Sequence, residues 1–139
     1  MPFTGKVGDT LFLSDIGGGH RRVILTKPND DGKVVITNFT TASHFDWNVV
    51  FRPRDNRRLY TERCTPNYHD MQLYPLSALL KIAQKNPTDY VFCARRDTQK
   101  IVNGALQSYH PSLEILEELA VQYPEEAKEC HRLAAEIDH

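Results

Sequence analysis

Long hydrophobic runs are missing from this chain of 139 residues, which argues against a membrane protein. No apolar stretch approaches the roughly 20 residues that a membrane-spanning helix needs. The opening residues, MPFTGKVGDTLF, also lack the apolar core of a secretory signal peptide. We therefore expect a cytoplasmic protein with no membrane partner.

Cysteine is scarce, and its placement argues against both a disulfide framework and a metal centre. The chain has three cysteines, Cys64, Cys93 and Cys130, which are far apart and odd in number, as is typical of reduced thiols in a reducing compartment. No Cys-x-x-Cys pair occurs. Cys130 and His131 are neighbours on an expected helix, where adjacent side chains do not face each other. The sequence therefore predicts no metal site.

The glycine run Gly17–Gly19 lacks the features of a nucleotide-binding loop. Its three glycines are consecutive, no Lys-Ser/Thr pair follows them, and the next segment is an expected strand rather than a helix. Taken alone, this run is best interpreted as a loop between two strands. The sequence therefore predicts no cofactor.

Net charge is nearly absent, at −1, but the charges are unevenly distributed. Residues 111–139 hold eight acidic and two basic side chains, a net charge of −6, so the first 110 residues carry +5. Within FRPRDNRRLYTERC, residues 51–64, five arginines face only Asp55 and Glu62. A basic body suits an anionic partner. The acidic tail either competes for that surface or, as we favour, packs its apolar face into the core.

Short β-branched segments separated by turn residues fill the first half of the chain, and helical periodicity fills the second. Strands are expected at residues 10–16, 22–27, 34–41, 47–52 and 71–75. Helices are expected at residues 75–86, 97–109, 110–123 and 124–137. In the last two helices the expected buried face carries Leu113, Leu116, Ala120, Leu133 and Ile137. This order predicts an α+β fold in which a small antiparallel barrel or sandwich, of which we favour the barrel, precedes C-terminal helices.

Two polar residues are expected to meet at one end of this barrel. Arg21 lies where a loop enters one strand, and Thr40 and Thr41 end the following strand. In an antiparallel pair, the beginning of one strand lies beside the end of its neighbour. A guanidinium can bind a phosphate there and stabilise the charge of a transition state, while a threonine hydroxyl hydrogen-bonds the same phosphate.

The segment VGDTLFLSDIGGGHRRVILTK, followed by GKVVITNFTTA, resembles the N-terminal half of the PemK/MazF-type toxins of bacterial type II toxin–antitoxin systems. The matching positions are Gly8-Asp9, Asp15, Gly19, Arg21 with VILT, and NFTTA. The later RCTPNYHDMQLYPLSALLKI resembles the closing strand and helix of that family, so the likeness covers about residues 6–86.

The resemblance implies an SH3-like β-barrel with its closing helix over residues 1–86, and residues 87–139 then form a helical extension packed on the barrel. It also implies a homodimer, a cognate antitoxin, and a metal-independent endoribonuclease that cleaves single-stranded RNA. In such a reaction the 2′-hydroxyl attacks the adjacent phosphate and leaves a 2′,3′-cyclic phosphate and a 5′-hydroxyl. Carried over to this chain, the residues that serve cleavage are Arg21 and Thr40.

Further residues are candidates for substrate binding. Thr41 adjoins Thr40, and Arg22 stands where the family commonly has proline. Gln72-Leu73 stand where it commonly has an arginine-threonine pair. The remaining candidates are four arginines and an interleaved tyrosine: Arg52, Arg54, Arg57, Arg58 and Tyr60. Such a mixture suits phosphates and stacked bases, but the same arginines also suit pairing with local acids or with the acidic tail.

Histidine side chains titrate near neutral pH and supply the acid and base candidates. His20 adjoins Arg21 and is the first choice, followed by His44 and His69. The leading hypothesis is an endoribonuclease in which Arg21 stabilises the developing charge, Thr40 positions the phosphate and His20 moves the proton. The alternative is a non-catalytic module that binds nucleic acid or protein on the same barrel.

Overall fold

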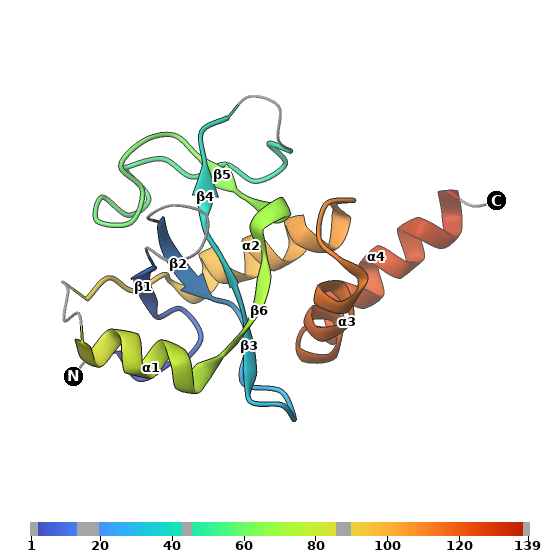
Figure 1. The fold of residues 1–139 in the computed structure, drawn as a ribbon. Helices are drawn as coiled ribbons and strands as arrows, with labels where there is room; N and C mark the ends of the chain where they lie inside the picture. Colours follow the sequence, from blue (N-terminus) through green and yellow to red (C-terminus); the bar gives the residue numbers. More distant parts are fainter. Residues whose placement is uncertain (1–2, 14–19, 43–45, 86–89, 138–139) are drawn as a thin grey trace.

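The computed structural model describes residues 3–13, 20–42, 46–85 and 90–137, with side chains up to Cys130 (Figure 1). The glycine run Gly17–Gly19, together with Asp15 and His44, lies outside the described residues. The strands are β1 (Thr10–Leu13), β2 (His20–Ile24), β3 (Lys33–Thr37), β4 (Phe39–Thr40), β5 (Thr65–Pro66) and β6 (Gln72–Pro75). The helices are the 3-10 turn η1 (Tyr68–Asp70), α1 (Leu76–Lys85), α2 (Arg95–Gln107), α3 (Leu113–Gln122) and α4 (Pro124–Ile137).

Four strands form one antiparallel sheet in the order β1-β2-β3-β6, and β4 pairs with β5 in a separate two-stranded ribbon. The expected strand 34–41 is interrupted at Asn38, after which the chain leaves the sheet as β4. The expectation of a strand at residues 47–52 is wrong, because only Phe51 makes a β-bridge there, to Cys64. The apolar side chains of this segment pack inward although the segment forms no strand. The spacing of apolar residues alone does not distinguish such a buried loop from a strand.

The fold is therefore α+β, but the described strands do not close into a barrel. β1 and β6 are the two edges of the sheet. The ribbon strands β4 and β5 have two residues each, which is too short to connect those edges. None of the helices in the described part of the chain is long and apolar enough to cross a bilayer.

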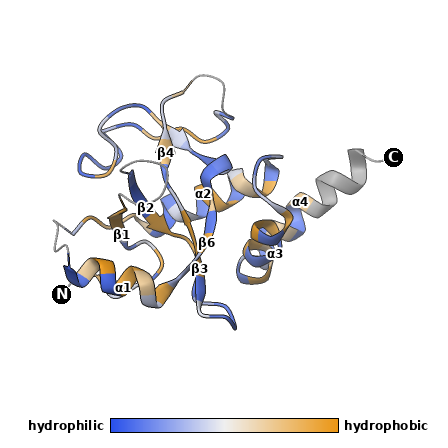
Figure 2. Ribbon diagram, viewed as in Figure 1, coloured by the Kyte–Doolittle hydropathy of each residue, from blue (hydrophilic) through white to orange (hydrophobic). Residues whose placement is uncertain are grey.

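Apolar residues cover both faces of the sheet, and each face has its own helices (Figure 2). On one face Leu11, Ile24 and Ile36 pack with Leu79 of α1. On the other face a larger cluster joins sheet residues to α2 and α3: Val23, Leu25, Val35, Ile101, Val102, Ala105, Ile115 and Leu119. Helices α2 and α3 thus share a core with the sheet.

The buried stripe of α3 differs from the expected one. Ile115 and Leu119 are buried, whereas Leu113 is 70% exposed, so the expected face that began at Leu113 is wrong. The Ser112 side chain caps α3 by accepting a hydrogen bond from the Ile115 N–H. That cap fixes where the helix begins, and Ile115 and Leu119, four residues apart, share the side that meets the sheet. The side chains of Leu133 and Ile137 lie outside the described ones.

The Gly8-Asp9 pair secures the N-terminal edge. Gly8 has a φ of +93°, and a Cβ atom there would lie 2.5 Å from the carbonyl oxygen of Cys93, so only glycine fits. The buried Asp9 carboxylate accepts hydrogen bonds from the backbone of Gly5 at 3.0 Å and from the hydroxyl of Tyr90 at 2.5 Å. Gly8-Asp9 therefore fixes the N-terminal segment to the residues that precede α2.

Candidate functional site

The residues expected to form one catalytic site are divided between two faces of the sheet. His20 and Arg21 are consecutive residues of β2, so their side chains point to opposite faces. The Arg21 Nη1 donates to Thr10 Oγ1 at 3.0 Å, and Thr10 Oγ1 donates to the carbonyl of Val91 at 2.6 Å. Arg21 thus contacts the edge strand β1, while His20 is exposed on the other face.

Thr40 lies in β4, which runs beside β2. Phe39 packs on the core cluster that contains Val23, which is the sheet face of Arg21. Thr40 follows Phe39 directly in β4 and points the other way, where its hydroxyl accepts a hydrogen bond from the Ala42 N–H at 3.1 Å. Alternation along the two strands therefore turns the Arg21 side chain away from those of His20 and Thr40. Thr41 is exposed just beyond β4.

Arg22 is not a substrate-binding residue, and that prediction is wrong. Its side chain is 0% exposed, and its Nη2 forms a salt bridge with the Asp70 carboxylate at 3.0 Å. Its Nη1 donates to the Asn38 side chain and to the Asp70 carbonyl, both at 3.4 Å. Arg22 holds η1 against the sheet, and no surface phosphate can reach it.

Five arginines stand on one closed loop. We call residues 52–63 the arginine loop; its ends are joined by the paired backbone hydrogen bonds between Phe51 and Cys64, each 2.9 Å long. Within the loop, the Asp55 carboxylate accepts from the Arg52 N–H at 2.7 Å, and the Asn56 side chain accepts from the Arg58 N–H at 3.2 Å. All five arginine side chains are exposed: Arg52, Arg54, Arg57, Arg58 and Arg63.

Tyr60 anchors the arginine loop instead of stacking on a base, so its predicted role is wrong. The ring is 1% exposed and stacks on Phe51, with 4.6 Å between the centroids. Its hydroxyl donates to the Asp97 carboxylate at 3.0 Å. Burial, followed by the Cys93 and Asp97 charges, raises the pKa of Tyr60 well above its ordinary value. The loop is therefore fixed to the start of α2 from inside.

The guanidinium groups of the arginine loop are open to an external anion. Within the described residues, no acidic side chain forms an ion pair with any of the five arginines. The acidic helices α3 and α4 lie on the opposite side of the molecule from the connection between β4 and β5 that includes this loop (Figure 1). The guanidinium of Arg63 lies over the Trp47 ring, 4.5 Å from its centroid, so an aromatic side chain borders the arginines.

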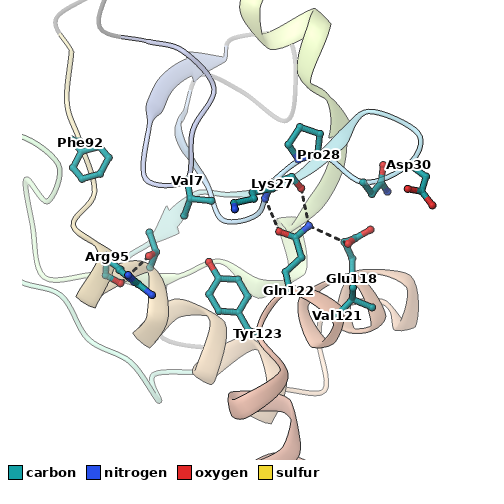
Figure 3. A pocket seen from close by; sticks show the side chains of 12 residues that line it. Val7, Lys27, Pro28, Asp30, Phe92, Arg95, Glu118, Val121, Gln122 and Tyr123 are labelled. Carbon is teal, nitrogen blue, oxygen red and sulfur yellow. Dashed lines mark hydrogen bonds between the residues drawn. The ribbon is translucent and has the colours of Figure 1, made fainter.

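A cleft of about 920 Å³ lies between the β2–β3 connection and helices α2 and α3 (Figure 3). Its polar groups already bond to each other. The Gln122 amide accepts from the Lys27 N–H and donates to the Lys27 carbonyl, both at 2.7 Å, and the Tyr123 hydroxyl donates to the Leu25 carbonyl. These bonds fasten the end of α3 to the sheet and leave few unpaired polar groups to orient a ligand.

No group of three or more His, Cys, Asp or Glu side chains among the described residues is arranged to hold a metal ion. Comparison with protein-family models, curated proteins and solved structures finds no match to this chain. The likeness to the PemK/MazF-type toxins therefore rests on the sequence motifs alone. The geometry singles out the arginine loop and Trp47 as the candidate nucleic-acid interface.

Proposed function

We propose that the chain binds single-stranded RNA through the arginine loop. The observation that carries this proposal is the set of exposed arginines without an acidic partner among the described residues, bordered by Trp47. Arginines release counterions when they contact phosphates, and aromatic rings stack with unpaired bases, a combination typical of single-strand binding. The loop also lacks the helix or β-ribbon that usually enters a major groove, which favours a single strand over a duplex.

We further propose that this RNA is cleaved without a metal, as the resemblance to the PemK/MazF-type toxins implies. The supporting observation is the element order over residues 10–85, where antiparallel strands are followed by α1. In this proposal the sheet and the β4–β5 ribbon are an opened version of an SH3-like barrel. A homodimer and a cognate antitoxin belong to the same proposal. Because Arg21 points to the opposite face of β2 from His20, the acid and base in this proposal are other groups.

Removing two loop arginines tests RNA binding. In Arg54→Ala/Arg57→Ala, we expect weaker binding of a short fluorescent single-stranded RNA in EDTA buffer. The slope of log affinity against log salt should fall by about 0.7 for each phosphate that the variant no longer neutralises. The measurement is fluorescence anisotropy over a salt series.

The matched control is Lys81→Ala/Lys128→Ala, which removes two exposed cations from α1 and α4. This variant loses the same total charge, so it separates a local binding surface from the net charge of the chain. Equal losses of affinity in the two variants, or an unchanged salt slope in the arginine variant, would contradict a binding site on the arginine loop.

A further inference from the structure

Two histidines meet beside the arginine loop. His69 comes from η1, and His110 follows the end of α2. Their rings lie 3.7 Å apart between centroids, with planes inclined by 34°. Together with Asp46 and Ser108 they form what we call the histidine cluster, built from three segments that are distant in the sequence.

A carboxylate and a hydroxyl fix one of the two imidazoles. The His110 Nε2 lies 3.6 Å from the Asp46 Oδ2. The Ser108 Oγ donates to the same Asp46 oxygen at 2.7 Å and accepts from the backbone N–H of His110 at 3.1 Å. These contacts hold the His110 ring in a fixed orientation beside the Asp46 carboxylate and against the His69 ring.

The turn that presents His69 is held on both sides. Tyr68 points inward, where it is buried and its hydroxyl donates to the Asn48 side chain at 2.8 Å. Burial, and secondarily the Asp46 charge, raise the pKa of Tyr68, so this hydroxyl stays protonated and keeps its bond. Asp70 on the other side is paired with Arg22. His69, between them, is exposed.

The histidine cluster adjoins the surface that we propose for RNA. Asp46 directly precedes Trp47, whose ring lies beneath the Arg63 guanidinium. Tyr109, between Ser108 and His110, is 98% exposed and presents a second aromatic ring for a base. The Asp46 carbonyl also accepts from the Thr65 hydroxyl at 3.0 Å, which fixes this segment to β5. An RNA strand bound at the arginine loop can thus extend to the imidazoles of His69 and His110.

We propose that His69 and His110 are the acid–base pair that cleaves RNA bound at the arginine loop, an inference that rests on the proposed function. RNA carries its own nucleophile, so cleavage needs only a base and an acid. The 2′-oxygen forms a bond to the adjacent phosphorus, and its proton passes to neutral His69. The bond from phosphorus to the 5′-oxygen breaks, and protonated His110 gives its proton to that oxygen. The products are a 2′,3′-cyclic phosphate and a 5′-hydroxyl.

The test compares His69→Gln and His110→Gln with His20→Gln, the first-choice histidine of the sequence analysis. Both cluster histidines reach the surface, so glutamine should be tolerated, and thermal melting checks the fold of each variant. Binding is measured by anisotropy with a 2′-deoxy strand of the same sequence, which lacks the nucleophile. Cleavage of the RNA strand is followed on gels in EDTA. We expect His69→Gln and His110→Gln each to slow cleavage by about a hundredfold or more, with nearly unchanged affinity, whereas a loss confined to His20→Gln would support the assignment made from the sequence.

Three results would overturn the inference, and they are distinguishable. Wild-type protein that binds RNA without cleaving it removes the acid–base pair and leaves the binding proposal standing. Cleavage that survives in both cluster variants, or is lost only in His20→Gln, assigns the chemistry elsewhere. Wild-type protein that binds neither strand removes the proposed function and the inference together.

Discussion

Replacing Asp70 by asparagine is expected to lower the free energy of unfolding by about 3 kcal/mol. The reason is that the substitution removes the carboxylate that pairs with the buried Arg22 guanidinium. Arg22 is 0% exposed, and its Nη2 forms a salt bridge with the Asp70 carboxylate, which is itself 27% exposed. Without that carboxylate, the buried guanidinium keeps its charge but loses this salt bridge. Its hydrogen bonds to Asn38 and to the Asp70 carbonyl are 3.4 Å long, compared with 3.0 Å for the salt bridge. Urea denaturation measures the effect as a lower midpoint at an unchanged slope.

The control for this prediction is Asp31→Asn, which removes an exposed carboxylate from the turn before β3. We expect that variant to unfold within about 0.5 kcal/mol of the wild type, as surface substitutions usually do. If Asp70→Asn were as stable as Asp31→Asn, the salt bridge would not be what keeps η1, and with it His69, in place.

Replacing Gly104 by alanine is expected to destabilise the protein although alanine is the better helix former. A Cβ atom at this position in α2 would lie 1.9 Å from the Tyr68 hydroxyl oxygen and 2.8 Å from a methyl carbon of Val49. Alanine gains about 1 kcal/mol in helix propensity, but the Tyr68 ring is buried and cannot move aside freely. Because overpacking of a core costs about 1–3 kcal/mol or more, and this approach is far inside van der Waals distance, we expect a net loss of about 2 kcal/mol.

Two further variants separate the clash from other effects at this position. Asn103→Ala adds the same helix former at the exposed neighbouring residue and should not destabilise the protein. Tyr68→Phe combined with Gly104→Ala removes the oxygen nearest to the added carbon and should recover part of the stability, as measured by the urea midpoint. No destabilisation in Gly104→Ala, or no recovery in the double variant, would contradict the close packing of η1 against α2.

Much of the fold follows from local patterns in the sequence. The period of apolar residues and the prolines locate α1 to α4 within a few residues, and short apolar or β-branched runs locate β1, β2, β3 and β6. The pattern fails at residues 47–52 and at β5, which has two residues, because pairing there depends on partners elsewhere in the chain. Closure of a barrel likewise depends on strand length and edge contacts that no local pattern reports.

The site is less predictable, because burial decides the role of each polar residue. Arginine is usually a surface residue, so the sequence favours substrate binding by Arg22, yet the side chain is buried and forms an ion pair with Asp70. One signal is present: alternation along His20–Ile24 places Arg22 on the same face as Ile24, which packs in the core. For His69 and His110 no such signal exists, because their contact depends on how η1 and the end of α2 pack together.

Ultraviolet cross-linking of the wild-type protein to single-stranded RNA in EDTA, followed by mass spectrometry of the peptides, tests the central claim most directly. The arginine loop and Trp47 form the proposed binding surface, and Tyr109 extends it. We predict adducts on peptides that contain Trp47, residues 52–63 or Tyr109, and their disappearance in Arg54→Ala/Arg57→Ala. Adducts confined to peptides of the cleft between Lys27 and Gln122, equally abundant in that variant, would contradict the account.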